Sequence, residues 1–287
     1  MDSILPTVNI AKIVSPYKTV VVGFFGVVYN GKEFNHAGLH ALNEMKKQGK
    51  NIILLSNSAE RIFSVLQLMK KHQVSPSVFS LIMTAGEMMH SLFFCNSKRI
   101  QLRGKKYFRL GFPIERPILS GLGFEQVEDI NNADFIFVGR LNHCGESVQQ
   151  YHEVLECSAA LNLPMVCVGN DVASYINGEI CDGSGLFAEQ YAMMGGKIHT
   201  LGKPDIHVLK YVLEDFPTKP EDLLIIGDSL PTDIKMANLY GADSVLVTGG
   251  VHKDSLGEGY IPDLQKAKDL CGDYGAYPKY LISELRW

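Results

Sequence analysis

Thr19-Val-Val-Val-Gly-Phe-Phe-Gly-Val-Val-Tyr-Asn-Gly31 is the stretch of sequence from which the fold can be inferred. A run of uncharged β-branched residues is typical of a strand buried on both faces, and the glycines after it indicate a tight loop. Doubly wound sheets present reactive groups where such a strand ends. Gly23 stands at that end, and the chain has no aspartate between Asp2 and Asp129. The stretch therefore predicts a strand and loop of the kind that carries a reactive group, but with glycine in place of an acidic residue at the end of the strand.

Strand and helix signals alternate on both sides of the middle of the chain. Buried strands are expected at 51–56, 78–83, 197–201, 222–226 and 244–248, with helices at 36–48, 59–72, 204–215 and 232–240. Strands joined by single helices favour a parallel sheet with right-handed crossovers. The predicted fold class is α/β, with a Rossmann-like parallel sheet at its core.

Residues 85–182 interrupt this alternation with a pattern of their own. Short strands are expected at 105–110, 133–138 and 164–168, with a long helix at 146–161. These elements predict an inserted α/β domain of residues 85–182 in a core domain of residues 1–84 and 183–287. Because ligands of open α/β sheets bind at the C-terminal ends of the strands, an insertion there is expected to act as a cap that selects substrates.

The composition indicates the class of protein. The chain has 287 residues, of which 46% are hydrophobic and 20% charged, which is ordinary for a globular protein with a sizeable core. It has neither a long apolar run nor an N-terminal signal pattern, so we expect a cytoplasmic protein without membrane contact. A net charge of −4 gives no general attraction to nucleic acid. Six cysteines without a C-x-x-C pair favour reduced thiols over disulfides.

Three polar segments follow three of the predicted core strands. Ser56 and Asn57 offer a hydroxyl and an amide that suit a phosphate, or alternatively cap the helix expected from residue 59. Lys203 brings an ammonium group to the mouth of the sheet, although alone it would be an ordinary surface lysine. Asp228 and Asp233 offer the oxygen ligands that Mg²⁺ prefers, unless Asp233 only caps its helix.

The order of these segments resembles the haloacid dehalogenase superfamily, and specifically its class IIA hydrolases, whose type C2a cap is inserted between the second and third motifs. The resemblance covers nearly the whole chain. It implies phosphate binding by Ser56 and Asn57, compensation of the phosphate charge by Lys203, and a metal site that includes Asp228, with Asp233 behind it.

The first motif departs from the family pattern. In family members an aspartate at the end of the first strand attacks phosphorus, and in most a second aspartate two residues later serves as acid and base. Gly23 and Phe25 occupy these two positions. Losing a covalent nucleophile costs on the order of 10⁴-fold in rate, or roughly 5 to 6 kcal/mol of barrier. Only the Phe25 carbonyl and Asp228 remain to hold Mg²⁺ directly, so any Mg²⁺ is expected to bind weakly.

The resemblance leaves three functions open. The first is a phosphatase-like protein, impaired or inactive as a phosphoaspartyl hydrolase, that still binds phosphate or a small phosphorylated metabolite. The second is an active Mg²⁺-dependent phosphohydrolase in which water attacks phosphorus directly. The third is a non-catalytic interaction protein. Asp171 and Asp182, near the cap boundary, are candidates to face the substrate. Neither nucleic acid nor a membrane is an expected partner, and a homodimer is expected only by analogy with relatives.

Overall fold

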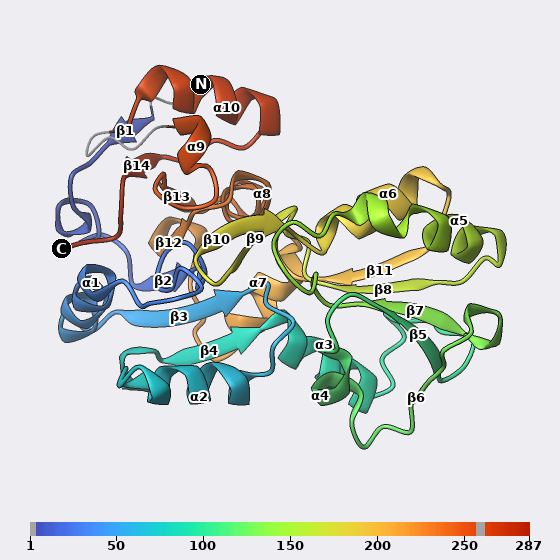
Figure 1. Ribbon diagram of the computed structural model, residues 1–287. Helices are drawn as coiled ribbons and strands as arrows, with labels where there is room; N and C mark the ends of the chain where they lie inside the picture. The colour runs from blue at the N-terminus through green and yellow to red at the C-terminus, as the bar shows by residue number, and fades with distance from the viewer. Residues whose placement is uncertain (1–3, 257–261) are drawn as a thin grey trace.

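The computed structural model describes residues 4–256 and 262–287, which form two α/β units side by side (Figure 1). The larger unit is built on a seven-stranded sheet in the order β1-β14-β13-β12-β2-β3-β4, in which every neighbouring pair is parallel. Its strands are β1 (Leu5–Pro6), β2 (Thr19–Val22), β3 (Asn51–Ser56), β4 (Leu81–Thr84), β12 (Leu223–Gly227), β13 (Asp243–Val247) and β14 (Tyr280–Ile282). The predicted α/β class with a parallel sheet core is confirmed.

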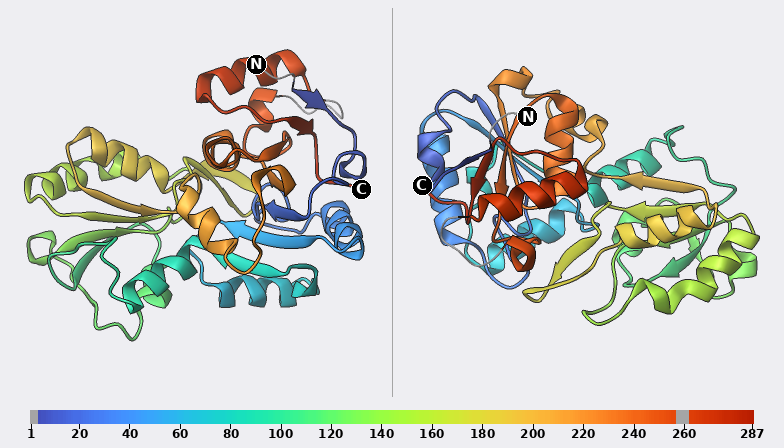
Figure 2. Two further views of the ribbon diagram at one scale, coloured as in Figure 1. Left: turned by 180° about the vertical axis from the view of Figure 1, so that it is seen from behind. Right: turned by 90° about the horizontal axis from the view of Figure 1, so that it is seen from above.

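Helices cover both faces of this sheet (Figure 2). They are α1 (His36–Lys47), α2 (Ile62–Lys71), α3 (Ala85–Phe94), α7 (Ile206–Val212), α8 (Lys235–Tyr240), α9 (Lys253–Leu256) and α10 (Leu264–Tyr274). Successive residues of a strand point to opposite faces, so Val20 and Val22 pack with the side chains of α1 and α2, whereas Val21 packs with those of α3, α7 and α8. The central strands are therefore buried on both sides, as their run of apolar residues predicts.

The register of the central strands aligns their C-terminal ends. Val22 lies opposite Leu54 of β3 and Ile226 of β12. The residues that follow these three strands consequently leave the sheet at one edge. This alignment brings the loop after β2, the Ser56 segment and the Asp228 segment together, although they are far apart in the sequence.

The smaller unit has a five-stranded parallel sheet in the order β11-β8-β7-β5-β6. Its strands are β5 (Lys106–Leu110), β6 (Glu125–Gln126), β7 (Phe135–Val138), β8 (Met165–Val168) and β11 (Ile198–Leu201), with helices α4 (Glu115–Leu119), α5 (His152–Ala160) and α6 (Gly185–Met193). We expected strand 197–201 in the larger sheet, but β11 pairs with β8 in the smaller one. The prediction was wrong because sequence order does not reveal the partner of a strand. The division into 1–84 with 183–287 and 85–182 stays a prediction.

A β-hairpin extends from the smaller unit toward the larger one. Its strands β9 (Ala173–Ile176) and β10 (Glu179–Asp182) are antiparallel, and Asn177 and Gly178 form the turn between them with φ of 53° and 90°. Left-handed residues at both positions are typical of a type I′ turn. The turn reaches the loop after β2, where a Cβ atom at Gly31 would lie 3.1 Å from the nitrogen of Gly178. The hairpin therefore closes over the C-terminal edge of the larger sheet.

Other differences from the sequence prediction are local. The expected helix 146–161 is divided into a 3₁₀ turn, Val148–Tyr151, and α5. The cysteines were expected to be reduced, but Cys144 and Cys181 form a disulfide, with their Cα atoms 5.1 Å apart. They are 37 residues apart in sequence, and only the folding of the hairpin brings them together. In the part of the chain that the structure describes, no helix has the length and apolar character that a membrane span requires.

Candidate functional site

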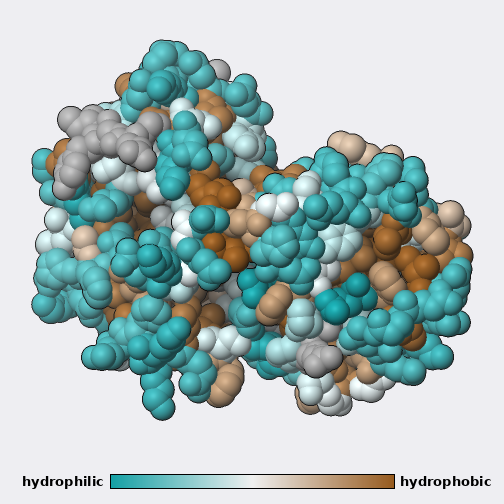
Figure 3. Space-filling view, in the orientation of Figure 1, coloured by the Kyte–Doolittle hydropathy of each residue, from teal (hydrophilic) through white to brown (hydrophobic). Residues whose placement is uncertain are grey.

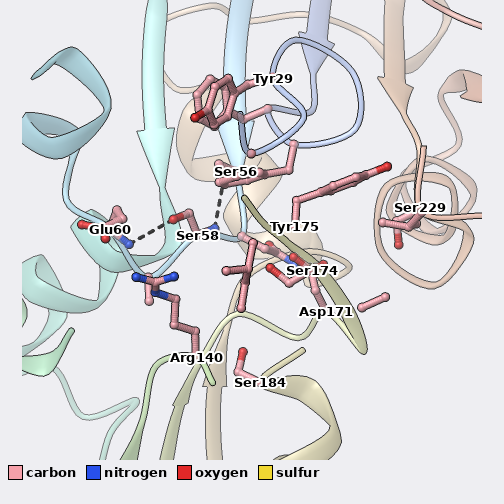
Figure 4. Close-up of a pocket in the computed structure, with 18 of the residues that line it drawn as sticks. Tyr29, Ser56, Ser58, Glu60, Arg140, Asp171, Ser174, Tyr175, Ser184 and Ser229 are labelled. Carbon is pink, nitrogen blue, oxygen red and sulfur yellow. Dashed lines mark hydrogen bonds between the residues drawn. The ribbon is translucent and has the colours of Figure 1, made fainter. Parts of the chain in front are cut away.

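A cavity of about 360 Å³ lies where the hairpin covers the edge of the larger sheet (Figure 4). The two units meet along a notch in the surface (Figure 3). The cavity is lined from both units, and its size suits a small metabolite. Of the residues predicted for the site, those that line it are Phe25, Ser56, Asn57, Asp171, Lys203, Asp228 and Asp233. Asp182 is not among the lining residues; it ends β10, opposite Ala173.

Gly23 lies at the end of β2, and its amide donates a hydrogen bond to the carbonyl of Ile226. Its backbone is outside the left-handed region that favours glycine. A Cβ atom at this position would lie 3.5 Å from Asp233 Oδ1 and 3.5 Å from Val27 Cγ2, which are ordinary contact distances. The local conformation therefore does not require glycine here, and a larger side chain would point toward Asp233.

Lys203 and Asp233 form a buried ion pair at the centre of the site. Lys203 Nζ lies 2.7 Å from Asp233 Oδ1, and the two side chains are 6% and 3% exposed. Burial opposes the charge of the ammonium group, but Asp233 and Asp171 outweigh burial and raise the pKa of Lys203. Lys203 is therefore charged at neutral pH, as its predicted role requires, and it is not the surface lysine that the alternative interpretation assumed.

Asn57 connects the larger unit to the smaller one. Its Nδ2 donates hydrogen bonds to Asp171 Oδ1 at 2.9 Å and to the carbonyl oxygen of Lys203 at 3.1 Å, while its Oδ1 accepts one from the Lys203 amide at 2.6 Å. The amide side chain thus fixes the backbone of Lys203 and the carboxylate of Asp171 together. Burial raises the pKa of Asp171, against the charge of Lys203 and the bond from Asn57.

The Ser56 segment forms a turn before α2. Ser56 Oγ accepts a hydrogen bond from the Ser58 amide at 3.1 Å, and Ser58 Oγ accepts one from the Glu60 amide at 3.1 Å (Figure 4). We expected a helix from residue 59, with this segment as a possible cap. The helix begins at Ile62 with Arg61 as its N-cap, so the capping interpretation is wrong. Both serines line the cavity instead.

Asp228 is enclosed by two glycines. A Cβ atom would lie 1.7 Å from Asp228 Oδ2 at Gly26 and 2.2 Å from Asp228 Cβ at Gly250, so only glycine fits at either position. The carboxyl accepts a hydrogen bond from the Val251 amide at 2.9 Å. Burial, together with the charge of Asp233, raises the pKa of Asp228 to about 8. This carboxyl group therefore loses its proton less readily than an exposed aspartate does.

The donor set does not fit a Mg²⁺ site of the usual strength. Within residues 4–256 and 262–287, no three His, Cys, Asp or Glu side chains are grouped as metal ligands. Asp233 is paired with Lys203, and the strand end that would supply a second carboxylate carries Gly23. Mg²⁺ prefers several hard oxygen ligands, and of the two aspartates predicted for the metal site only Asp228 is not ion-paired in the described structure.

Aromatic side chains form one wall of the site. Phe25 contacts Phe24 and Tyr29 edge-on, with ring centroids 5.1 and 5.8 Å apart, and it lines the cavity where family members carry the acid–base aspartate. Tyr175, on the hairpin, lines the cavity from the other unit. The sequence prediction missed Tyr175 and the cap residue Arg140. The Asn177-Gly178 pair is a hairpin signature that would have predicted the turn next to Tyr175.

His252 holds the loop that supports Asp228. It is 8% exposed, and its Nε2 accepts a hydrogen bond from the Leu230 amide at 3.1 Å. Burial lowers the pKa of His252 to about 4. The folded protein therefore keeps this imidazole neutral at a pH where the unfolded chain, with a pKa of about 6.5, takes up a proton.

This difference predicts a loss of stability in mild acid. Because the folded-state pKa is depressed, the contribution of His252 is complete above pH about 6.5 and declines as the pH falls toward 4. We expect the free energy of unfolding to fall by about 2 to 3 kcal/mol more in the native protein than in His252→Gln between pH 7.5 and 4.5. Urea titrations at the two pH values measure this difference. Equal losses in the two proteins would show that the imidazole does not contribute.

Comparisons with known proteins agree with this geometry. A family model described as HAD-hydrolase-like matches residues 200–271. Sugar-phosphatase AraL of Bacillus subtilis is 24% identical over 264 residues, which cover 88% of this chain and 91% of the relative. Chronophin of Mus musculus is 24% identical over 264 residues, covering 87% of this chain and 86% of that protein.

Solved structures share the whole architecture. A haloacid dehalogenase-like hydrolase of Brucella suis superposes with a TM-score of 0.80 at 24% identity, covering 96% of this chain and 98% of that one. NagD of E. coli superposes with a TM-score of 0.61 at 20% identity, covering 93% and 96%. The chain therefore shares its fold with haloacid dehalogenase-like hydrolases, and residues 200–271 match the HAD-hydrolase-like family model.

Proposed function

We propose that this protein binds a small phosphorylated molecule in the cavity and does not hydrolyse it through an aspartyl-phosphate. The observation that carries the proposal is Gly23, which leaves the end of β2 without a nucleophile while the buried Lys203–Asp233 pair beside it is intact. Relatives named as a sugar phosphatase and a 5′-nucleotidase support a phosphorylated small molecule as the ligand.

The residues around Gly23 suit the phosphate end of such a ligand. Lys203 supplies a positive charge, and Ser56 supplies a hydroxyl group from the turn after β3. Asn57 holds the backbone of Lys203, so the ammonium group is fixed before the ligand arrives. In this proposal Lys203 binds phosphate directly, and Asp233 orients Lys203 through their 2.7 Å contact.

The charge balance favours binding without a strongly held metal. A nucleophilic aspartate would place a negative charge next to the phosphate, which a cation normally offsets. With glycine at position 23, the site has one negative group fewer, so a phosphate needs less positive charge to bind. We therefore propose that Mg²⁺, if it binds through Asp228 and the Phe25 carbonyl, binds weakly and increases affinity only modestly.

Phosphate release and ligand binding, measured on the same preparation, test this proposal. Purified protein is offered a panel of sugar phosphates, nucleotides and small phosphoesters with Mg²⁺, beside Asp228→Asn as a matched variant. We expect turnover on the order of 10⁴-fold or more below an ordinary enzyme of median activity, together with saturable binding of some members in calorimetry.

Other outcomes separate the remaining alternatives. Fast Mg²⁺-dependent hydrolysis that Asp228→Asn abolishes, without a trapped aspartyl intermediate, would contradict the expected low turnover and establish direct attack by water. If the protein neither turned over nor bound phosphoesters, a non-catalytic interaction protein would be favoured. Asp228 and Asp233 would then serve only in ion pairing and packing.

A further inference from the structure

Arg140 brings a second positive group to the cavity from the smaller unit. It follows β7 and Gly139, and both residues line the cavity. Figure 4 shows its side chain extending from the cap toward the turn that carries Ser58 and Glu60. Lys203 lines the same cavity from the segment after β11. Two cations on separate elements therefore face one small space.

Among the described residues, no carboxylate pairs with the guanidinium of Arg140, whose charge contacts only the Phe112 ring. Its Nε is buried without a hydrogen-bond acceptor, and no ion pair to it forms among residues 4–256 and 262–287. The negative charge of Glu60 acts on it without contact, and burial lowers the pKa of Arg140, although arginine stays charged in proteins. A partly buried cation without an acceptor is costly unless a bound group supplies one.

The surrounding backbone fixes Arg140 in place. The Phe112 amide donates a hydrogen bond to the Arg140 carbonyl at 2.8 Å, and the Phe112 ring lies 4.0 Å from the guanidinium carbon. Gly111 has a left-handed φ of 75°, and a Cβ atom there would lie 2.2 Å from the Arg140 carbonyl oxygen. The ring covers one face of the guanidinium, so its edge, with the N–H donors, is what remains for a ligand.

We propose that Arg140 binds a carboxylate of the ligand, at the opposite end from the phosphate held by Lys203. A carboxylate carries the single negative charge that one guanidinium balances, and its two oxygens match the paired N–H donors of the arginine edge. The ligand class is thus a compact phosphomonoester of a carboxylic acid. This inference rests on the proposed binding of a phosphorylated molecule.

A matched pair of probes tests the inference. 3-Phosphoglycerate and glycerol 3-phosphate share a three-carbon chain and a phosphate ester, but only the first has a carboxylate. In calorimetric titrations of the full chain at pH 7.5, we expect 3-phosphoglycerate to bind about tenfold or more tightly than glycerol 3-phosphate. Arg140→Gln should remove this preference by weakening 3-phosphoglycerate binding much more than glycerol 3-phosphate binding, while Arg140→Lys should retain part of the preference.

Arg103→Gln is the matched control. Arg103 is an exposed arginine of the same unit that donates to the Leu161 carbonyl and does not line the cavity, so its loss should leave the preference intact. Equal binding of the two probes by the native protein, or equal losses of both in Arg140→Gln, would overturn the role of Arg140 and leave phosphate binding standing. Failure of the native protein to bind either probe would overturn the proposed function and this inference together. If Arg140→Gln does not fold, the inference is tested by the binding of the two probes to the native protein and to Arg140→Lys.

Discussion

Gly23→Asp is expected to convert this protein into one that takes a phosphoryl group from a bound phosphomonoester and releases it slowly. A Cβ atom at residue 23 has ordinary contacts at 3.5 Å and points toward Asp233, so a carboxylate can enter beside Lys203 without displacing the backbone. Lys203, already paired with Asp233, can then contact the new carboxylate as well. Phe25 still offers no acid or base, so hydrolysis of the acyl phosphate should lag behind its formation.

The double variant Gly23→Asp/Phe25→Asp should restore turnover. A carboxyl at position 25 can protonate the leaving group and later activate water, a role that commonly contributes 10²- to 10⁴-fold. We expect phosphate release on the order of 10⁴-fold above that of the native protein. Mass spectrometry of the single variant should detect one added phosphoryl group, and a steady-state assay should detect turnover in the double variant.

Gly23→Asn controls for the volume of the new side chain, because its amide is not a nucleophile. It should neither become phosphorylated nor turn over. If the native protein already released phosphate as fast as the double variant, the absent nucleophile would not limit the chemistry. If both variants folded and bound phosphoesters but stayed inert, more than the first motif would have been lost.

Lys203→Met is expected to destabilise the fold by about 3 to 5 kcal/mol, the typical effect of breaking a buried ion pair. The substitution keeps a similar volume but leaves Asp233 charged and 3% exposed. Asp171 and Asp228 also interact electrostatically with Lys203. Without the lysine charge, the repulsion between these aspartates and Asp233 is no longer offset. Urea-induced unfolding of the native and variant proteins measures the difference.

Lys18→Met is the matched control for that prediction. Lys18 Nζ also lies 2.7 Å from a carboxylate, that of Asp222, but its side chain is 74% exposed. Solvent screens such pairs, so we expect a much smaller loss than in Lys203→Met. Similar losses in the two variants would show that burial does not set the strength of the central pair. Adding Asp233→Asn to Lys203→Met should recover part of the stability, because it removes the unpaired charge.

Much of the larger unit was accessible from the sequence, because its signals are local. The apolar runs at Thr19–Val22 and Asn51–Ser56 are strands, as predicted, since short apolar runs rich in β-branched residues favour strands buried on both faces. Asp228 and Asp233 lie at the C-terminal edge of the larger sheet because β12 ends there, whereas Lys203 reaches the same cavity from β11 of the smaller sheet. Their roles in binding stay predictions.

The sequence by itself determined the order of the elements, the parallel core and the glycine where a nucleophile is expected, because each depends on residue type and short-range periodicity. Tertiary structure alone decided the partner of β11, the Cys144–Cys181 disulfide, the raised pKa of Asp228 and the position of Arg140 in the cavity. Each of these depends on contacts between segments far apart in the chain, where burial and neighbouring charges, rather than residue type, set the energy.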